Sequence, residues 1–244
     1  MKDKIKTTLV IDAGNTRIKA GVFAESNLKE VFYFGNKDWK ALKSFLLEYQ
    51  FDQSILSSVR SEKETNWLLQ MMPNSIHFKN SGVLSIKHRY VTPETLGSDR
   101  LANIIGASYL SNTANLIIDI GTCIKFDLID ENNCYLGGSI SPGINLRYKS
   151  LQAYTGALPL VQEYSLPSIL GNSTTTCIHS GVMLGIQSEI NSFIAIYTSQ
   201  YKNLSIYVTG GDAHCFDIHT KNGIFVELNL TLIGLYHSIP TYAS

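Results

Sequence analysis

The sequence predicts an α/β protein built from two copies of one unit. One short pattern occurs twice, 107 positions apart: an apolar β-run ends at Asp12 or Asp119, turns through glycine and a hydroxyl residue, and resumes as a strand. In each half, three strands come first and helices then alternate with strands. This repetition indicates an internal duplication with a boundary near residues 111–114, so we expect lobes at 1–112 and 113–244.

The first half begins with a meander of three strands. Apolar and β-branched runs predict these strands at 7–12, 17–23 and 29–34. Apolar positions at helical spacing then predict a helix, followed by a short buried strand and a second helix. A further strand, an irregular stretch and a last helix complete this half. We expect these later elements at 38–49, 54–59, 62–71, 75–78, 80–96 and 98–110.

The second half repeats this order. Three strands are again followed by a helix and an irregular stretch, and a long helix precedes the last strands. A Gly-Gly pair separates one of these strands from a helix expected to begin at Asp212, and a closing helix ends the chain. The remaining elements are expected at 116–119, 124–129, 135–140, 144–154, 155–167, 174–200, 205–209 and 224–226.

Composition and charge exclude several classes of protein. The chain has 244 residues, enough for one large domain or two smaller ones with real cores. Twenty basic residues balance twenty acidic ones, so we expect no nucleic-acid partner. No apolar run approaches the ~18 residues that cross a bilayer, so we expect no membrane segment. Four scattered cysteines without metal spacing fit reduced thiols, and we place the protein in the cytoplasm.

The two Asp–Gly turns carry the main functional prediction. Gly14 and Gly121 permit tight turns and let backbone N–H groups approach a ligand. Asp12 and Asp119 supply hard oxygen ligands for a cation that accompanies phosphate. Two such hairpins facing each other would hold a polyphosphate from both sides, which predicts phosphoryl transfer. The alternative is that each aspartate only stabilises its own turn.

Two further features fit a nucleotide. Strand alternation puts Arg17 and Lys19 on one face, where cations suit phosphate oxygens, although a solvated edge strand would look the same. The Gly210-Gly211 pair after a strand would let a base or ribose lie against bare backbone, unless it is a plain strand-to-helix turn. The sequence contains neither a Walker loop nor a Rossmann fingerprint.

A carboxylate and a guanidinium stand together where the helix at 98–110 begins. Asp99 could accept a proton from a substrate hydroxyl, while Arg100 and the helix end hold an anionic group. The alternative is that Ser98 or Asp99 only caps the helix.

Six motifs follow one another along the chain, at 12–16, 97–100, 119–122, 137–143, 171–174 and 209–211. Together they resemble the type III pantothenate kinases, over nearly the whole chain. The resemblance implies a duplicated actin-like (ribonuclease H-like) fold, with two βββαβα-type lobes and a central cleft, and a homodimer with the substrate pocket at its interface. It also implies ATP-dependent phosphorylation of pantothenate to 4′-phosphopantothenate, the first step of coenzyme A biosynthesis.

The resemblance assigns roles residue by residue. Asp99 would be the proton acceptor, and Asp119 would hold a monovalent cation, K⁺ or NH₄⁺. Mg²⁺ near Asp12 would bridge the ATP phosphates. The implied ATP-binding residues are Asp12, Ala13, Gly14, Asn15, Thr16, Arg17, Ile18, Lys19 and Thr122. The implied pantothenate-binding residues are Tyr90, Gly97, Ser98, Asp99, Arg100 and Thr174.

Two stretches depart from the usual pattern of that family. Residues 123–126 replace a small-residue and threonine run, and residues 145–148 stand where a methionine is frequent, which leaves nucleotide and cation preference open. Two other functions remain as alternatives: a kinase of the same fold for another small acid or a sugar, and a nucleotide-binding regulatory protein without turnover. Arg100 and Tyr90 favour a partly apolar anion over a sugar.

Overall fold

The computed structural model describes residues 6–79, 86–218 and 223–242. The chain forms two compact units, one that ends at Leu110 and resumes at Asn229, and one that spans Ser111–Leu228. The sequence placed the last helix in the second lobe, at 113–244, whereas the structure groups it with the first unit. The reason is its packing, because this helix lies against the helix at Ser98–Leu110 and against the first strand.

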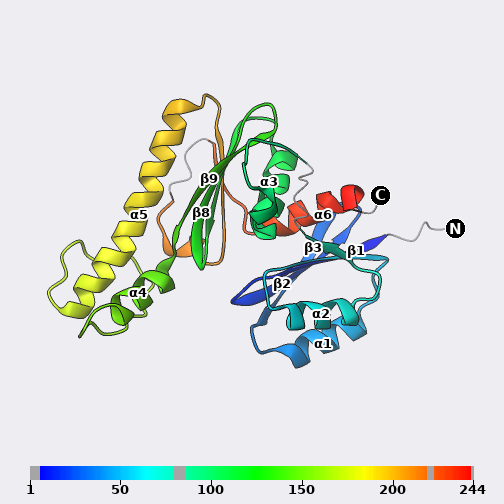
Figure 1. The fold of residues 1–244 in the computed structure, drawn as a ribbon, viewed down its shortest axis with the longest axis horizontal. Helices are drawn as coiled ribbons and strands as arrows, with labels where there is room; N and C mark the ends of the chain where they lie inside the picture. The colour runs from blue at the N-terminus through cyan, green and yellow to red at the C-terminus, as the bar shows by residue number, and fades with distance from the viewer. Residues whose placement is uncertain (1–5, 80–85, 219–222, 243–244) are drawn as a thin grey trace. The chain divides into compact units, whose positions relative to one another are not determined.

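The first unit is a five-stranded sheet with helices on its faces (Figure 1). Its strand order is β3-β2-β1-β4-β5, in which β1 runs antiparallel to β2 and parallel to β4. Its strands are β1 (Thr7–Ala13), β2 (Arg17–Ala24), β3 (Asn27–Gly35), β4 (Gln53–Ser58) and β5 (Ile76–Phe78), with a short β6 (Lys87–His88) later in the chain. Its helices are α1 (Trp39–Glu48), α2 (Glu62–Met71), the 3-10 turn η1 (Pro93–Thr95), α3 (Ser98–Leu110) and α6 (Leu230–Tyr242).

Successive side chains along β1 alternate between the two faces of this sheet. Leu9 and Ile11 are fully buried and pack with Leu42 of α1 and Leu68 of α2. Because successive side chains point to opposite faces, Asp12 points to the other side. That side carries α3 and α6, which contact β4 and β1.

The helices α3 and α6 cross at glycines. A Cβ atom on Gly234 of α6 would overlap the carbonyl of Ala102 in α3, and one on Gly106 would lie 2.6 Å from the Leu230 carbonyl oxygen. The two backbones are therefore in direct contact. Tyr236 then stacks on Phe23 of β2, with ring centroids 4.3 Å apart, which fixes α6 on the sheet.

A histidine on α6 makes the stability of this unit dependent on pH. Burial lowers the pKa of His237 below its ordinary 6.5, and burial does the same to His77 of β5. The unfolded chain therefore binds more protons, and the folded state is expected to lose stability as pH falls below about 6.5. His237→Phe keeps the ring stacked on Tyr109, at a centroid distance of 3.4 Å in the wild type.

Urea unfolding at about pH 7.5 and about pH 5.5 is expected to show a smaller loss of stability in this variant than in the wild type. An equal loss in both proteins would mean that the proton uptake occurs elsewhere.

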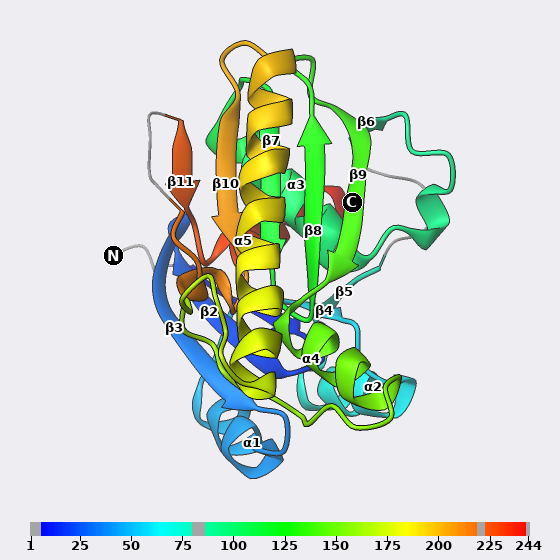
Figure 2. The same ribbon diagram turned by 90° about the vertical axis from the view of Figure 1, so that its left-hand side faces the viewer.

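The second unit repeats the order of three strands followed by helices. Within it the strands lie in the order β11-β10-β7-β8-β9, and α5 runs across one face of them (Figure 2). Its strands are β7 (Asn115–Ile120), β8 (Cys123–Ile129), β9 (Cys134–Pro142), β10 (Ser205–Thr209) and β11 (Ile224–Val226). Its helices are α4 (Ile144–Ala153), α5 (Thr174–Gln200) and the 3-10 turn η2 (Ala213–Cys215).

Alternation again sorts the side chains of the central strands. Ile118 and Phe126 pack with Met183 and Ile186 of α5 in the core of this unit. The residues that alternate with them along the strands, Asp119 among them, therefore lie on the face opposite α5. Ser173 caps α5, because its hydroxyl accepts a hydrogen bond from the backbone N–H of Thr176.

The predicted α/β fold with a repeated order is confirmed, and one predicted helix is wrong. The expected helix from Asp212 is only the three-residue turn η2, because Phe216 is buried and takes an extended backbone. The side chain of Gln187 holds the next residue: it accepts from the Asp217 N–H at 2.9 Å and donates to the Asp217 carbonyl at 3.1 Å. None of the helices that the structure describes combines the length and apolarity needed to span a bilayer.

Candidate active site

The first Asp–Gly turn joins β1 to β2. Strand register places Asp12 directly opposite Lys19, so both side chains lie on the same face of the sheet. Arg17 and Lys19 lie over the ring of Tyr33, with the guanidinium carbon 5.1 Å and the ammonium nitrogen 5.5 Å from its centroid. The predicted shared face of the two cations is therefore present. At the turn itself, Asn15 and Thr16 are exposed.

A serine on β4 connects this hairpin with the start of α3. Asp12 is the register partner of Ser57, which is fully buried. The Ser57 hydroxyl donates to the hydroxyl of Ser98 at 3.1 Å. The first turn of α3 is thereby held one strand away from Asp12, so two of the predicted motifs lie close together in the first unit.

The helix α3 begins at Ser98, two residues earlier than a capping role for Asp99 requires. The Leu101 N–H donates to the Gly97 carbonyl at 3.0 Å, so Gly97 precedes the helix. The cap position of α3 therefore falls on Gly97, and not on Ser98 or Asp99 as the alternative interpretation had it. Asp99 lies in the first turn, where its carboxylate accepts from the Arg100 N–H at 2.9 Å. A Cβ atom at Gly97 would lie 2.6 Å from Asp99 Oδ1, so the carboxylate folds back over the glycine.

Arg100 and Tyr90 meet at the same helix start. The Arg100 side chain is buried, with the residue only 5% exposed, and its guanidinium carbon lies 5.7 Å from the centroid of the Tyr90 ring. The backbone carbonyl of Tyr90 is 3.1 Å from Nδ1 of His88. A buried guanidinium beside a helix N-terminus favours an anionic ligand, and the adjacent carboxylate can accept a proton from a hydroxyl.

The second Asp–Gly turn joins β7 to β8 in the other unit. Register places Asp119 opposite Lys125, and the Lys125 ammonium lies 2.7 Å from Asp119 Oδ2. Among the described residues, no atom would lie within 4 Å of a Cβ added to Gly121. Neither the backbone angles nor a protein neighbour therefore requires glycine here, which leaves room for a ligand beside this turn.

Other glycines pack on this second turn rather than on a ligand. A Cβ atom on Gly143 would overlap the Gly121 carbonyl, and the Gly143 N–H donates to the Thr122 carbonyl at 3.1 Å. Gly210 has φ +99° and lies against the backbone of Ile120, so only glycine fits there without strain. The Gly210-Gly211 loop is thus fixed to the end of β7, beside the turn that carries Thr122.

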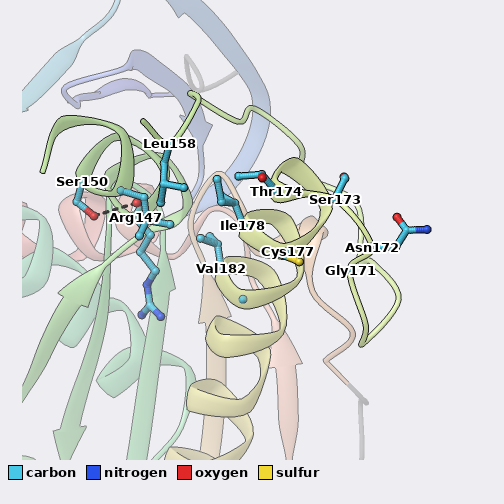
Figure 3. Close-up of a pocket in the computed structure, with 12 residues that line it drawn as sticks. Arg147, Ser150, Leu158, Gly171, Asn172, Ser173, Thr174, Cys177, Ile178 and Val182 are labelled. Carbon is cyan, nitrogen blue, oxygen red and sulfur yellow. Dashed lines mark hydrogen bonds between the residues drawn. The ribbon is translucent and has the colours of Figure 1, made fainter. Parts of the chain in front are cut away.

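Thr174 lies in a cavity of about 960 Å³ between α4 and the first turns of α5 (Figure 3). It is the first residue of α5, which follows the cap at Ser173. The cavity wall is mainly apolar, formed by Leu151, Leu158, Ile178 and Val182. Arg147 of α4 adds the only charged side chain among the lining residues that the structure describes.

An ion pair joins the helices on either side of this cavity. Arg147 pairs with Glu189 of α5, and its Nε donates to the Pro142 carbonyl at 2.8 Å. The same Glu189 carboxylate accepts from the Ser141 hydroxyl. The end of β9, the start of α4 and the middle of α5 are thus tied together, next to the Gly143 contact with the second turn.

Sequence reasoning missed Ser57 and Glu189 and gave Lys125 no role. A serine near a strand end and a glutamate inside a long helix have no local signature. The pairing of Asp119 with Lys125 could have been predicted from the hairpin, because a short turn fixes the register of the two strands.

Metal binding in either unit needs ligands that the chain does not bring together by itself. Across the described ranges, no group of three or more His, Cys, Asp and Glu side chains is placed to hold a metal ion. A Mg²⁺ ion at Asp12 would therefore take most of its ligands from phosphate oxygens and water, as Mg²⁺ commonly does with nucleotides.

Solved structures with this fold have little sequence in common with the chain. A conserved Campylobacter jejuni protein, provisionally assigned to the Baf family of transcriptional activators, superposes with a TM-score of 0.61 and 21% identity over 96% of this chain and 98% of its own. A Sinorhizobium meliloti protein provisionally assigned as a 2-dehydro-3-deoxygalactonokinase gives 0.54 at 9% identity, covering 96% of each chain. The chain therefore has the actin-like α/β fold, in which both units show the order of three strands followed by helices.

The actin-like fold, two Asp–Gly turns and a basic helix start define a small-molecule kinase. The family model described as type III pantothenate kinase matches residues 8–196. Relatives named type III pantothenate kinase are 40% identical in Flavobacterium johnsoniae, over 93% of this chain and 95% of theirs, and 41% identical in Christiangramia forsetii, with the same coverage. The chain belongs to the type III pantothenate kinase family.

Proposed function

We propose that this chain transfers the γ-phosphoryl group of ATP to the hydroxyl of pantothenate, as the first step of coenzyme A biosynthesis. Family membership over nearly the whole chain supports this activity. The single observation that supports the chemistry is the cluster of Tyr90, Asp99 and Arg100 at the start of α3. The products are 4′-phosphopantothenate and ADP.

Asp99 acts as the proton acceptor. It lies in the first turn of α3 and is partly exposed, so a substrate hydroxyl can reach it. As the hydroxyl oxygen attacks the γ-phosphorus, its proton passes to the Asp99 carboxylate, which holds the nucleophile in line.

Arg100 and Tyr90 bind the acidic end of pantothenate. The buried guanidinium supplies charge and fixed donor geometry for a carboxylate, and the Tyr90 ring covers apolar atoms. Gly97 and Ser98 complete this part of the site, and Thr174 contacts the substrate from α5. Positioning and charge account for most of the catalysis, since phosphoryl transfer requires little covalent work from the protein.

The β1–β2 turn binds the ATP phosphates. Its exposed tip and the two cations of β2 suit phosphate oxygens, and Asp12 would hold Mg²⁺, which would supply positive charge to the phosphates. The residues proposed here are 12–19, with Thr122 of the second turn. The monovalent cation at Asp119 and the cytoplasmic location stay predictions of the sequence.

Measurement of ADP release tests the proposed function. The protein is incubated with ATP and Mg²⁺, in separate KCl and NaCl series, with pantothenate, with common sugars, or with no acceptor. Release that depends on pantothenate is the expected result. Release with a sugar would support the alternative kinase, and release with none of them in either salt would contradict the proposed function.

The homodimer is part of the proposal. The loop between α4 and α5 exposes large apolar side chains: Tyr154 is 89% exposed, Ile169 80% and Leu170 84%. Such a group of exposed apolar residues indicates a protein contact. A second copy of the chain fits, because the loop leads directly to the cap of α5 and to Thr174.

Leu170→Asp is expected to convert the dimer to monomers, because a charge in an apolar interface loses its water without gaining a partner. Light scattering after size-exclusion chromatography measures the mass. Leu47→Asp on α1 is the matched control, since Leu47 is 67% exposed on the other unit. A dimer that persists in the Leu170 variant would place the interface elsewhere.

A further inference from the structure

The carboxylate that the sequence assigns to a monovalent cation already has a cation in contact with it. The Lys125 ammonium lies 2.7 Å from Asp119 Oδ2, and the two side chains are 15% and 14% exposed. A K⁺ or NH₄⁺ ion at this oxygen would have to displace the lysine or sit beside it, with like charges in contact. The residues present therefore do not fit a monovalent cation at Asp119.

The ion pair between Asp119 and Lys125 follows from the register of the two strands that carry them. Asp119 and Lys125 are register partners across β7 and β8, so their side chains leave the sheet on the same face. That face is opposite α5, whose core contacts come from Ile118 and Phe126. In the first unit, Asp12 and Lys19 face each other in the same way across β1 and β2.

The chemistry of the lysine matches that of the ion it replaces. A lysine side chain ends in an ammonium group with three N–H donors, the same charged group as NH₄⁺ on a flexible stem. With both side chains mostly buried, the attraction between the charges is stronger than it would be in water.

We propose that Lys125 takes the place of the monovalent cation at Asp119, so that this kinase works without K⁺ or NH₄⁺. The proposal rests on the proposed kinase function. The lysine supplies a fixed positive charge beside the open turn at Gly121, where no protein atom in the described ranges would lie within 4 Å of an added Cβ. Its charge is present whatever the salt.

The first test compares activity in KCl and in NaCl at equal ionic strength. The wild type is expected to release ADP at rates that differ by less than about 2-fold. Lys125→Thr is expected to lose about 10²-fold in NaCl, as when one electrostatic stabiliser is removed, and to recover much of this in KCl. Lys202→Thr, at an exposed position after α5, is the control and is expected to behave as the wild type.

A binding measurement decides the question independently of turnover. The melting temperature of Lys125→Thr is expected to rise in about 0.2 M KCl relative to NaCl, because an ion bound only to the folded state stabilises it. The wild type is expected to show no such difference. Lys125→Gln is a second variant that keeps the length of the side chain if the threonine variant does not fold.

Two results would overturn the inference while leaving the kinase intact: a wild type that needs K⁺ for activity, or a folded Lys125 variant that K⁺ neither reactivates nor stabilises. Absence of ADP release from the wild type in both salts would instead contradict the proposed function. In that case the melting temperatures still decide whether Lys125 replaces the ion.

Discussion

Asp99→Asn is expected to lower kcat by about 10²–10⁴-fold with the fold retained, because an amide cannot accept the proton of the attacking hydroxyl. The substitution keeps the size of the side chain and an oxygen that can accept from the Arg100 N–H. The helix start should therefore stay intact. Pantothenate-dependent ADP release measures kcat, and circular dichroism checks the fold.

Glu94→Gln is the matched control for this variant. Glu94 lies in η1, four residues before the helix, and is exposed. Removal of its charge should leave kcat within about 2-fold of the wild type, as for most exposed charges. Turnover by Asp99→Asn at the wild-type rate would mean that Asp99 has only a structural role.

Periodicity was enough to predict most of the fold. The helices at 62–71, 98–110 and 174–200 have the predicted bounds. The helix expected from Asp212 is wrong, because Phe216 has an extended backbone and Gln187 of α5, distant in sequence, hydrogen-bonds the N–H and the carbonyl of Asp217. Local sequence contains no signal for such a contact.

The sequence predicted the motifs of the candidate site, but not the contacts that join these motifs to the rest of the fold. Asp99, Arg100 and Tyr90 come together as the motif suggested. The Ser57 hydroxyl joins this motif to β4 by its hydrogen bond to Ser98. This contact depends on which strands are neighbours in the sheet, and no sequence pattern indicates it. The assignment of a monovalent cation to Asp119 came from the resemblance, whereas the residues themselves indicated only a cation that accompanies phosphate. Lys125, which lies opposite Asp119, belongs to the stretch 123–126 that departs from the family pattern.

The crossing of α3 and α6 holds the helix that carries Asp99 in place. Gly234→Ala is expected to destabilise the first unit by about 1–3 kcal/mol, because the new methyl group would meet the Ala102 carbonyl, a backbone atom that cannot turn aside. Intrinsic helix propensity acts in the opposite direction, since alanine is favoured over glycine by about 1 kcal/mol. A net loss would therefore come from packing.

Gly181→Ala is the matched control, because it makes the same glycine-to-alanine substitution in a helix where the new methyl group meets no neighbouring backbone among the described residues. Gly181 lies inside α5, and no described atom would be within 4 Å of its new Cβ, so this variant is expected to be as stable as the wild type or slightly more stable. Both tryptophans, Trp39 and Trp67, lie in α1 and α2, so their fluorescence during urea unfolding reports on the first unit, while circular dichroism follows both. If Gly234→Ala unfolds at the wild-type urea concentration, the two helices can separate at little cost, and the position of Asp99 must then depend mainly on the Ser57–Ser98 hydrogen bond.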